Sequence, residues 1–196
     1  MTVRWPADAS HIAQAAERLR AGAVIAFPTD TLYGVGARAS DAAAVARLYR
    51  VKRRPAGQPM VWLVTDRAQV ERFAVVSPAA TELMDRYWPG PLTLVLPALV
   101  PTEGSTIAVR APDHDVALAL LTSLGEPIAS SSANPAGQPP PIDADQVIAG
   151  WDDELDLVLD GGPCRIGRPS TILDLSGATP RILRQGAIRS TELIRG

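Results

Sequence analysis

Residues 23–39, AVIAFPTDTLYGVGARA, contain a short buried strand that runs into a polar loop. The apolar residues 23–27 have the length and composition of a buried strand, and Pro28 ends it because proline cannot donate to a sheet ladder. Thr29 and Thr31 follow at once. Since ligands of open α/β sheets bind where strands run out into loops, both hydroxyls are candidate ligand contacts.

The glycines at the end of this stretch fit the pattern G-x-G-x-x-A between a strand and a helix. A dinucleotide-binding fingerprint begins directly at the strand end, whereas residues 28–33 intervene here. We therefore expect these glycines to form a turn close to the ligand. A phosphate-binding loop of the form G-x-x-x-x-G-K-[ST] is excluded, because Lys52 lacks the preceding glycines.

Helix and strand patterns alternate on both sides of this stretch. Amphipathic helices are expected at residues 9–22, 41–52, 77–88 and 115–124. Ser10 and Ser40 are the expected N-caps of the first two helices, and Gly22 is the expected end of the first. Further strands are expected at residues 60–64, 92–96, 106–110, 126–132, 155–159, 170–175 and 181–183. The alternation predicts an α/β fold in one domain over residues 1–196, with a mixed sheet flanked by helices.

The composition is that of a globular domain with little net charge. Of the 196 residues, 46% are hydrophobic and 20% are charged, and the net charge is −2, so a nucleic acid would have to bind a local patch. The single cysteine cannot form an internal disulfide. His11 and His114 lie far apart, so no metal site held by the protein is expected. The absence of a signal-peptide core or a membrane-length apolar run predicts a cytoplasmic location without membrane contact.

Hydroxyl and arginine side chains gather at the expected strand ends. They are Thr29, Thr31, Thr106, Arg110, Ser130 to Ser132, Ser170, Thr171 and Arg184. Hydroxyls among arginines suit an anionic, polar small molecule. No base is placed to activate Cys164, His114 suits a structural or surface role, and Asp160 suits either a ligand contact or a turn. A site without a protein nucleophile favours phosphoryl or nucleotidyl transfer, which depends on positioning and charge neutralisation.

Eight motifs in a fixed order point to a known family. They are PTDTLYG (28–34), Lys52-x-Arg54-Pro55, WPGPLTLVL (88–96), TIAVRAP (106–112), SSSAN (130–134), LDGG (159–162), STILD (170–174) and LRQGAI (183–188). With these motifs the chain resembles the YrdC/TsaC family, the threonylcarbamoyl-AMP synthases, over nearly its whole length. The resemblance implies a YrdC-like α/β domain whose twisted mixed sheet and flanking helices surround a deep concave cavity. It also implies the short, single-domain form, since the sequence ends at Gly196.

The resemblance implies a reaction in which L-threonine, bicarbonate or CO2, and ATP give threonylcarbamoyl-AMP, pyrophosphate and water. The threonine amino group captures carbon dioxide, and the carbamate oxygen attacks the α-phosphorus, so the substrates supply the nucleophile. The product would pass to a separate tRNA threonylcarbamoyl transferase complex, which modifies the adenosine next to the anticodon. Mg²⁺ is implied as the companion of ATP, held by phosphates and water rather than by the protein.

The same resemblance assigns residues to two substrate sites. The threonine-binding set is Thr31, Arg110, Ser130 and Ser170, with Arg110 as a two-point clamp on the carboxylate. The ATP-binding set is Lys52, Arg54, Gln58, Thr106, Ser132, Asn134 and Arg184. Lys52, the only lysine of the chain, and Arg54 are the implied catalytic residues. In an extended segment they would face the triphosphate together, with Arg53 turned away.

Three positions depart from the family pattern, and two other functions stay open. Gln58, Leu63 and Pro140 stand where relatives have Asn or Lys, histidine, and serine respectively. One alternative is an RNA-binding module with weak contact to tRNA or other RNA; the net charge of −2 argues against tight binding. The other is a paralogue of the same fold that makes a different carbamoyl adenylate, or none. Pyrophosphate release with and without threonine and bicarbonate separates these functions.

Overall fold

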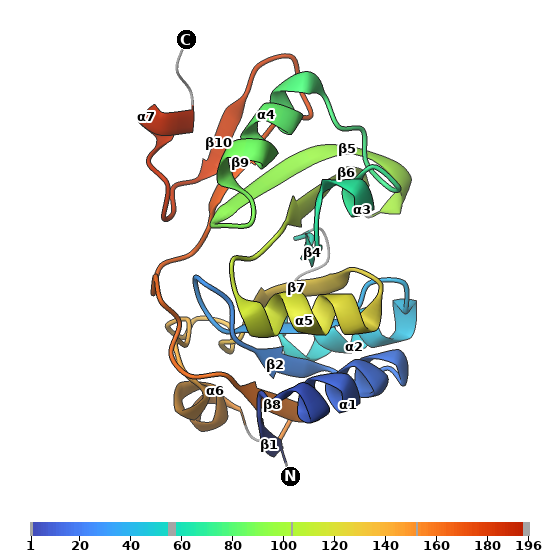
Figure 1. Cartoon of the computed structure of the whole chain (residues 1–196), viewed down its shortest axis with the longest axis vertical. Helices are drawn as coiled ribbons and strands as arrows, with labels where there is room; N and C mark the ends of the chain where they lie inside the picture. The colour runs from blue at the N-terminus through green and yellow to red at the C-terminus, as the bar shows by residue number, and fades with distance from the viewer. Residues whose placement is uncertain (1, 55–57, 103, 152, 194–196) are drawn as a thin grey trace.

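One mixed β-sheet runs through the computed structural model, which describes residues 2–54, 58–102, 104–151 and 153–193 (Figure 1). Its strands are β1 (Val3–Pro6), β2 (Ile25–Phe27), β3 (Gly34–Arg38), β4 (Val61–Leu63), β5 (Leu92–Thr102), β6 (Gly104–Arg110), β7 (Ile128–Ser132), β8 (Leu157–Asp160), β9 (Thr171–Asp174) and β10 (Arg181–Arg184). The helices are α1 (Ala9–Arg20), α2 (Ala42–Val51), α3 (Arg67–Val70), α4 (Pro78–Tyr87), α5 (Asp115–Leu124), α6 (Ala144–Gly150) and α7 (Ser190–Leu193). The predicted α/β domain is confirmed, while Pro55 of the Lys52 motif lies outside the described residues.

The strand order brings distant motifs together. The strands lie in the order β1-β8-β2-β3-β7-β4-β6-β5-β9-β10. Four neighbouring pairs are parallel, namely β1 with β8, β8 with β2, β4 with β6, and β5 with β9. The other neighbouring pairs are antiparallel. Because Gly34 of β3 pairs with Ser132 of β7, the PTDTLYG loop and the SSSAN motif meet at the same end of the sheet.

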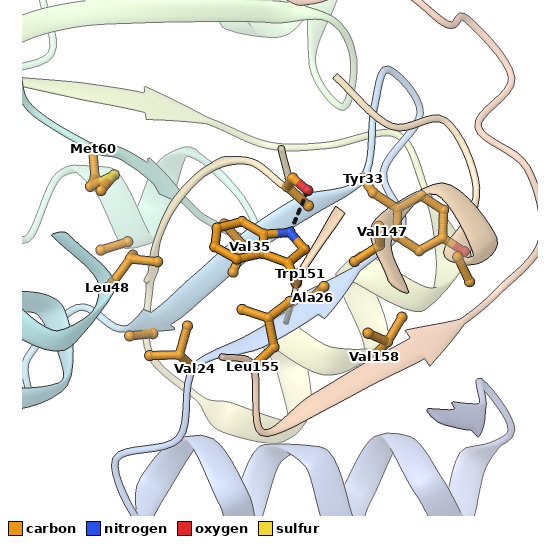
Figure 2. Close-up of a cluster of buried hydrophobic side chains, with 14 of the residues drawn as sticks. Val24, Ala26, Tyr33, Val35, Leu48, Met60, Val147, Trp151, Leu155 and Val158 are labelled. Atoms are coloured by element: carbon orange, nitrogen blue, oxygen red, sulfur yellow. Dashed lines mark hydrogen bonds between the residues drawn. The ribbon is translucent and has the colours of Figure 1, made fainter. Parts of the chain in front are cut away.

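β2 is buried on both faces, as its continuous apolar run predicts. Successive side chains point to opposite faces of a strand, so this run supplies two cores. Val24 and Ala26 pack with α2 and α6 in the cluster drawn in Figure 2. Ile25 and Phe27 pack with α1 and α5 on the other face. Helices therefore cover both sides of this half of the sheet.

The other half of the sheet has α4 on one face. Leu92, Leu94 and Leu96 of β5 pack with Met84 of α4 in a third cluster. Figure 1 shows α4 lying across β5 and β9. The residues between these leucines point to the opposite face, where the candidate site lies.

Both expected serine caps are wrong. α1 is capped by Asp8 and α2 by Asp41, and each carboxylate accepts from the backbone amide three residues further on, at 3.0 Å. Serine and aspartate cap equally well, so composition does not decide between neighbouring candidates. Ser10 instead lies within the first turn of α1.

The glycines expected to form a turn lie in strand β3. The reason is close packing, because a Cβ at Gly36 would lie 2.9 Å from the carbonyl oxygen of Ala129 on β7. Four short elements were also not predicted from the sequence, because they hold too few residues to show a hydrophobic period: β1, α3, α6 and α7. None of the helices in the described ranges is long and apolar enough to cross a bilayer.

Candidate active site

The face of β5, β6 and β9 that lies away from α4 lines a cavity of about 680 Å³. Alternation along the strands aims Thr93, Arg110 and Ile172 into this cavity, while Leu92, Leu94 and other neighbours pack on α4. The wall also includes residues from the loop after β2, from β4, from the ends of β7 and β10, and from the segment that holds Arg54 and Gln58. The cavity therefore lies where several polar motifs converge.

Thr29 fixes the loop that follows β2. Its hydroxyl donates to the carbonyl oxygen of Leu32 at 2.6 Å and accepts from the amide of Thr31 at 3.2 Å. From a neighbouring loop, the amide of Gly167 donates to the carbonyl oxygen of Thr31 at 3.0 Å. The loop backbone is therefore held from two sides, and it presents the Thr31 hydroxyl to Arg110.

Arg110 ends β6 and is 6% exposed. Its Nε donates to the carbonyl oxygen of Gly90 at 3.0 Å, one terminal nitrogen donates to Thr31 Oγ1 at 2.8 Å, and the other donates to the Asp30 carboxylate. Burial lowers the pKa of Arg110, and the charge of Asp30 opposes this effect. The remaining N–H groups have no partner among the described residues, so the guanidinium can still hold a carboxylate.

Ser170 is held by side chains from two strands. Arg184 of β10 donates through Nε and a terminal nitrogen to the Ser170 carbonyl oxygen, at 3.1 and 3.0 Å. Ser170 Oγ lies 3.1 Å from the same terminal nitrogen of Arg184 and 2.8 Å from Thr93 Oγ1. A Cβ at Gly186 would collide with the Ser170 backbone, which explains the glycine of the LRQGAI motif.

The described lining of the cavity contains Arg54, Arg110 and Arg184 but no carboxylate. Burial, followed by the charge of Arg54, lowers the pKa of Arg184, so these two guanidiniums lie within electrostatic reach of each other. Arg54 is held by the carbonyl oxygens of Gln58 and Pro59, at 2.8 and 3.0 Å. This concentration of positive charge suits a ligand with several negative charges.

Lys52 does not lie in an extended segment, so the expected alignment with Arg54 is wrong. It is the helical C-cap of α2, with φ −70° and ψ −11°, and Arg53 has φ 48°. The ammonium donates to the carbonyl oxygens of Ser132, at 2.7 Å, and Asn134. Lys52 is 6% exposed and is not among the described residues that line the cavity. Lys52 therefore holds the SSSAN loop through its backbone carbonyls and does not belong to the described cavity lining.

Trp151 supports the same loop. Its indole nitrogen donates to the carbonyl oxygen of Ala133 at 2.8 Å, as Figure 2 shows, and the Lys52 ammonium lies 5.8 Å from its ring centroid. The Ala133 amide donates to the carbonyl oxygen of Tyr33 at 2.8 Å. The carbonyls of residues 132–134 are thus each bonded to a buried or half-buried donor. These bonds fix the backbone that carries the cavity-lining side chain of Ser132.

Lys52 is expected to lose its proton near pH 8. Burial, with a smaller contribution from the charge of Arg54, lowers its pKa from 10.5 to about 8. The unfolded chain binds more protons between these values, so the free energy of unfolding should rise with pH across that window. Because Lys52 is the only lysine, the side-chain carbons of a lysine-labelled sample report its titration in NMR spectra without overlap.

The expected midpoint of this titration is about 8, and Lys52→Met should flatten the rise in the free energy of unfolding. Arg53→Met is the matched control, since the Arg53 side chain is 81% exposed. A midpoint near 10.5, the ordinary value for lysine, would show that burial does not lower this pKa, and the free energy of unfolding would then not rise with pH across the window.

The cavity brings together most of the residues that the sequence points to. Its lining includes Thr31, Arg54, Gln58, Arg110, Ser130, Ser132, Ser170 and Arg184, and also the two further departures Leu63 and Pro140. Lys52, Thr106 and Asn134 are absent from the described lining. Asn134 instead shapes its loop, because its amide nitrogen donates to the carbonyl oxygen of Gln138 at 2.8 Å and its amide oxygen accepts from Ser132 at 2.6 Å.

Asp30 and Thr93 are residues of the site that were not predicted from the sequence. Asp30 is 1% exposed and pairs with Arg110, whereas Thr93 is fully buried beside Ser170. A signal existed for both, since each is a polar residue next to apolar neighbours in one of the quoted motifs, PTDTLYG and WPGPLTLVL. A buried polar group must be paired, so such interruptions indicate a specific partner.

The remaining candidate residues have structural surroundings. Burial raises the pKa of Cys164 to about 11 and lowers that of His114. Asp160 accepts from the Gly162 amide at 3.1 Å, which confirms the turn interpretation, and it also pairs with Arg4 at 2.6 Å. No group of three His, Cys, Asp or Glu side chains in the described ranges could hold a metal ion.

The sheet and the cavity define an α/β domain built around a cavity that is lined by three arginines and by several hydroxyl side chains. A protein-family model for Sua5, YciO and YrdC, described as telomere recombination, matches residues 17–186. The chain therefore belongs to the Sua5/YciO/YrdC family.

Relatives with curated names and solved structures agree with this assignment. The threonylcarbamoyl-AMP synthase of Bacillus subtilis is 42% identical, with 98% of this chain and 60% of the relative aligned. The enzyme of the same name from Chromohalobacter salexigens is 38% identical over 88% of this chain and 97% of the relative. Crystalline Pyrococcus abyssi Sua5 complexed with L-threonine superposes with a TM-score of 0.87 at 41% identity, covering 95% of this chain and 57% of the other. The chain thus spans little more than half the length of the first and third relatives and nearly all of the second.

Proposed function

We propose that the chain is a threonylcarbamoyl-AMP synthase, which joins L-threonine, bicarbonate or CO2, and ATP. The observation that carries this proposal is one cavity, of about 680 Å³, that holds the Arg110 guanidinium and the pair Arg54 and Arg184 together. A cavity of this size suits small substrates and cofactors. The names of the relatives and the L-threonine in the Pyrococcus abyssi Sua5 structure support the same substrates.

In the proposed threonine site, the N–H groups that Arg110 leaves free bind the substrate carboxylate. Thr31 and Ser170 place hydroxyls beside this clamp. Ser130 donates its own proton to the carbonyl oxygen of Val35 at 3.0 Å, so towards a ligand its oxygen acts as an acceptor. An acceptor at this position suits a substrate amine or hydroxyl.

In the proposed ATP site, Arg54 and Arg184 neutralise the phosphates, with Gln58 and Ser132 on the same wall. Lys52 and Asn134 contribute through the loop that they hold. Thr106 is not among the described residues that line the cavity, so the proposal gives it no contact with ATP. Mg²⁺ would arrive with ATP, because the described lining offers no carboxylate to bind it. When bound, the ion would neutralise charge on the phosphates.

The reaction needs no nucleophile from the protein. The threonine nitrogen attacks carbon dioxide and releases a proton to solvent water, which gives a carbamate. When bicarbonate is the source, that proton leaves with the bicarbonate oxygen as water. A carbamate oxygen then attacks the α-phosphorus of ATP, and the bond to the β-phosphate breaks, so that pyrophosphate leaves. The guanidiniums of Arg54 and Arg184 stabilise the charge that moves to the leaving group.

The proposal extends to the partners of the protein. A mixed anhydride of a carbamate and a phosphate is an activated acyl donor, and in the proposed function a second enzyme would transfer the threonylcarbamoyl group from it to tRNA. A cytoplasmic location would place the two enzymes together. The RNA-binding alternative keeps only the positive charge of the cavity as its support, and such binding would fade with salt because few phosphates are neutralised.

Omission of single substrates tests the proposal. Pyrophosphate release from ATP should require both L-threonine and bicarbonate, and Arg54→Met should reduce it at least about tenfold by removing a phosphate contact. Arg53→Met is the matched control and should behave as wild type, since its side chain is 81% exposed. Release that ignores threonine would contradict the proposal, and RNA binding without any release would favour the RNA-binding alternative.

A further inference from the structure

Thr93 is a fully buried hydroxyl on the cavity wall. It lies on β5 between Leu92 and Leu94, which pack on α4, so alternation turns its side chain to the cavity. β5 and β9 are parallel and pair Thr93 with Ile172. This register brings Thr93 Oγ1 to 2.8 Å from Ser170 Oγ.

The direction of the proton between Thr93 and Ser170 follows from the available acceptors. Among the described residues, Thr93 Oγ1 has Ser170 Oγ as its partner. If Ser170 donated, the Thr93 proton would be left buried without an acceptor, which is costly. Thr93 therefore donates, and Ser170 Oγ also accepts from Arg184 at 3.1 Å.

With two donors directed at its oxygen, the Ser170 hydroxyl has one direction left for its own proton. That proton is free for an acceptor atom on a bound ligand. Arg184 also holds the Ser170 carbonyl oxygen through two further hydrogen bonds, so the backbone of Ser170 is fixed independently of Thr93. Without the Thr93 hydroxyl, the Ser170 hydroxyl could therefore rotate, while the Ser170 backbone would stay in place.

We propose that Thr93 is a positioning residue, which acts on the amino-acid substrate by orienting the hydroxyl of Ser170. The inference rests on the proposed function, in which Ser170 contacts threonine. Arg184 is held through the Ser170 carbonyl oxygen, so ATP binding does not depend on Thr93. Thr93 thus affects one substrate and leaves the other unchanged.

Thr93→Val tests the proposal, because valine keeps the β-branched shape that suits a strand and removes the hydroxyl. We expect KM for threonine to rise about fivefold, as for the loss of one hydrogen bond, with KM for ATP and kcat changed by less than about twofold. Thr93→Ser keeps the hydroxyl and should restore KM for threonine. Equal rises in both KM values, or none in either, would overturn the proposal.

A double-mutant cycle with Ser170→Ala separates positioning from direct contact. If Thr93 acts through Ser170, then Thr93→Val should change KM for threonine by less than about twofold in the Ser170→Ala background. Additive effects would show that Thr93 acts on its own and would overturn the proposal. Wild-type protein without threonine-dependent pyrophosphate release would instead refute the proposed function, so the two failures are distinguishable. Thermal unfolding of all variants shows whether a loss of stability accounts for either effect.

Discussion

Arg110→Met is expected to lower kcat/KM for threonine by about 10²–10⁴-fold, because two charge-assisted hydrogen bonds to the carboxylate are lost. It should also reduce the free energy of unfolding by about 3–5 kcal/mol, since Asp30 would be left as a buried charge without its partner. Steady-state kinetics and denaturant unfolding measure the two effects. Arg181→Met is the control, because the Arg181 side chain is 73% exposed and its partner Asp174 also accepts hydrogen bonds from the amide and the hydroxyl of Ser176.

Two further variants separate the roles of Arg110 in binding and in folding. Arg110→Lys keeps the charge but loses the fork, so KM for threonine should rise at least about tenfold while KM for ATP barely moves. Adding Asp30→Asn to Arg110→Met removes the unpaired charge and should recover part of the lost stability without recovering activity. An equal effect of Arg110→Lys on both substrates would show that Arg110 is structural.

Discrimination between amino acids is the second large effect. Hydroxyls of Thr31, Ser130 and Ser170 surround the proposed threonine site, and a site built to hydrogen-bond a substrate hydroxyl rejects analogues that lack it. Valine has the shape of threonine without the hydroxyl, so we expect its kcat/KM to fall by about 10³-fold or more. Serine keeps the hydroxyl and lacks a methyl group, which should cost about 10–200-fold.

These ratios are measured directly as kcat/KM for pyrophosphate release with threonine, serine and valine. Serine should rank between threonine and valine. Comparable rates with valine and threonine would mean that the hydroxyls of the cavity do not read the substrate side chain. In that event the assignment of threonine would fail even if another amino acid were adenylated.

The sequence predicts the architecture best where a segment has a clear apolar run or an amphipathic pattern. The run AVIAF predicts a buried strand, and the structure places helices on both sides of it. The small residues of GVGAR are harder to interpret, because a strand that packs closely against its neighbour has the same composition as a turn. Gly36 lies in such a closely packed strand, and this is evident only from its pairing with β7.

The site was predictable as a set of residue types and not as a geometry. Arg54, Arg110 and Arg184 come together because strands from distant parts of the chain share one cavity. The i, i+2 spacing of Lys52 and Arg54 predicts a common direction only for extended backbone, and a helix end at Lys52 removes that assumption. Asp30 and Thr93 act on the site through Arg110 and Ser170, so their roles depend on partners that sequence spacing does not identify.

The most direct test of the account identifies the product formed from ATP, L-threonine and ¹³C-labelled bicarbonate. Mass spectrometry of a rapidly quenched reaction should show an adenylate that contains AMP, threonine and one labelled carbon, with pyrophosphate in equal amount. Arg110→Met should not form it at a comparable rate. An adenylate without the label, or AMP alone released at the same rate with and without threonine, would contradict the claim that the cavity joins a threonine carbamate to the α-phosphate.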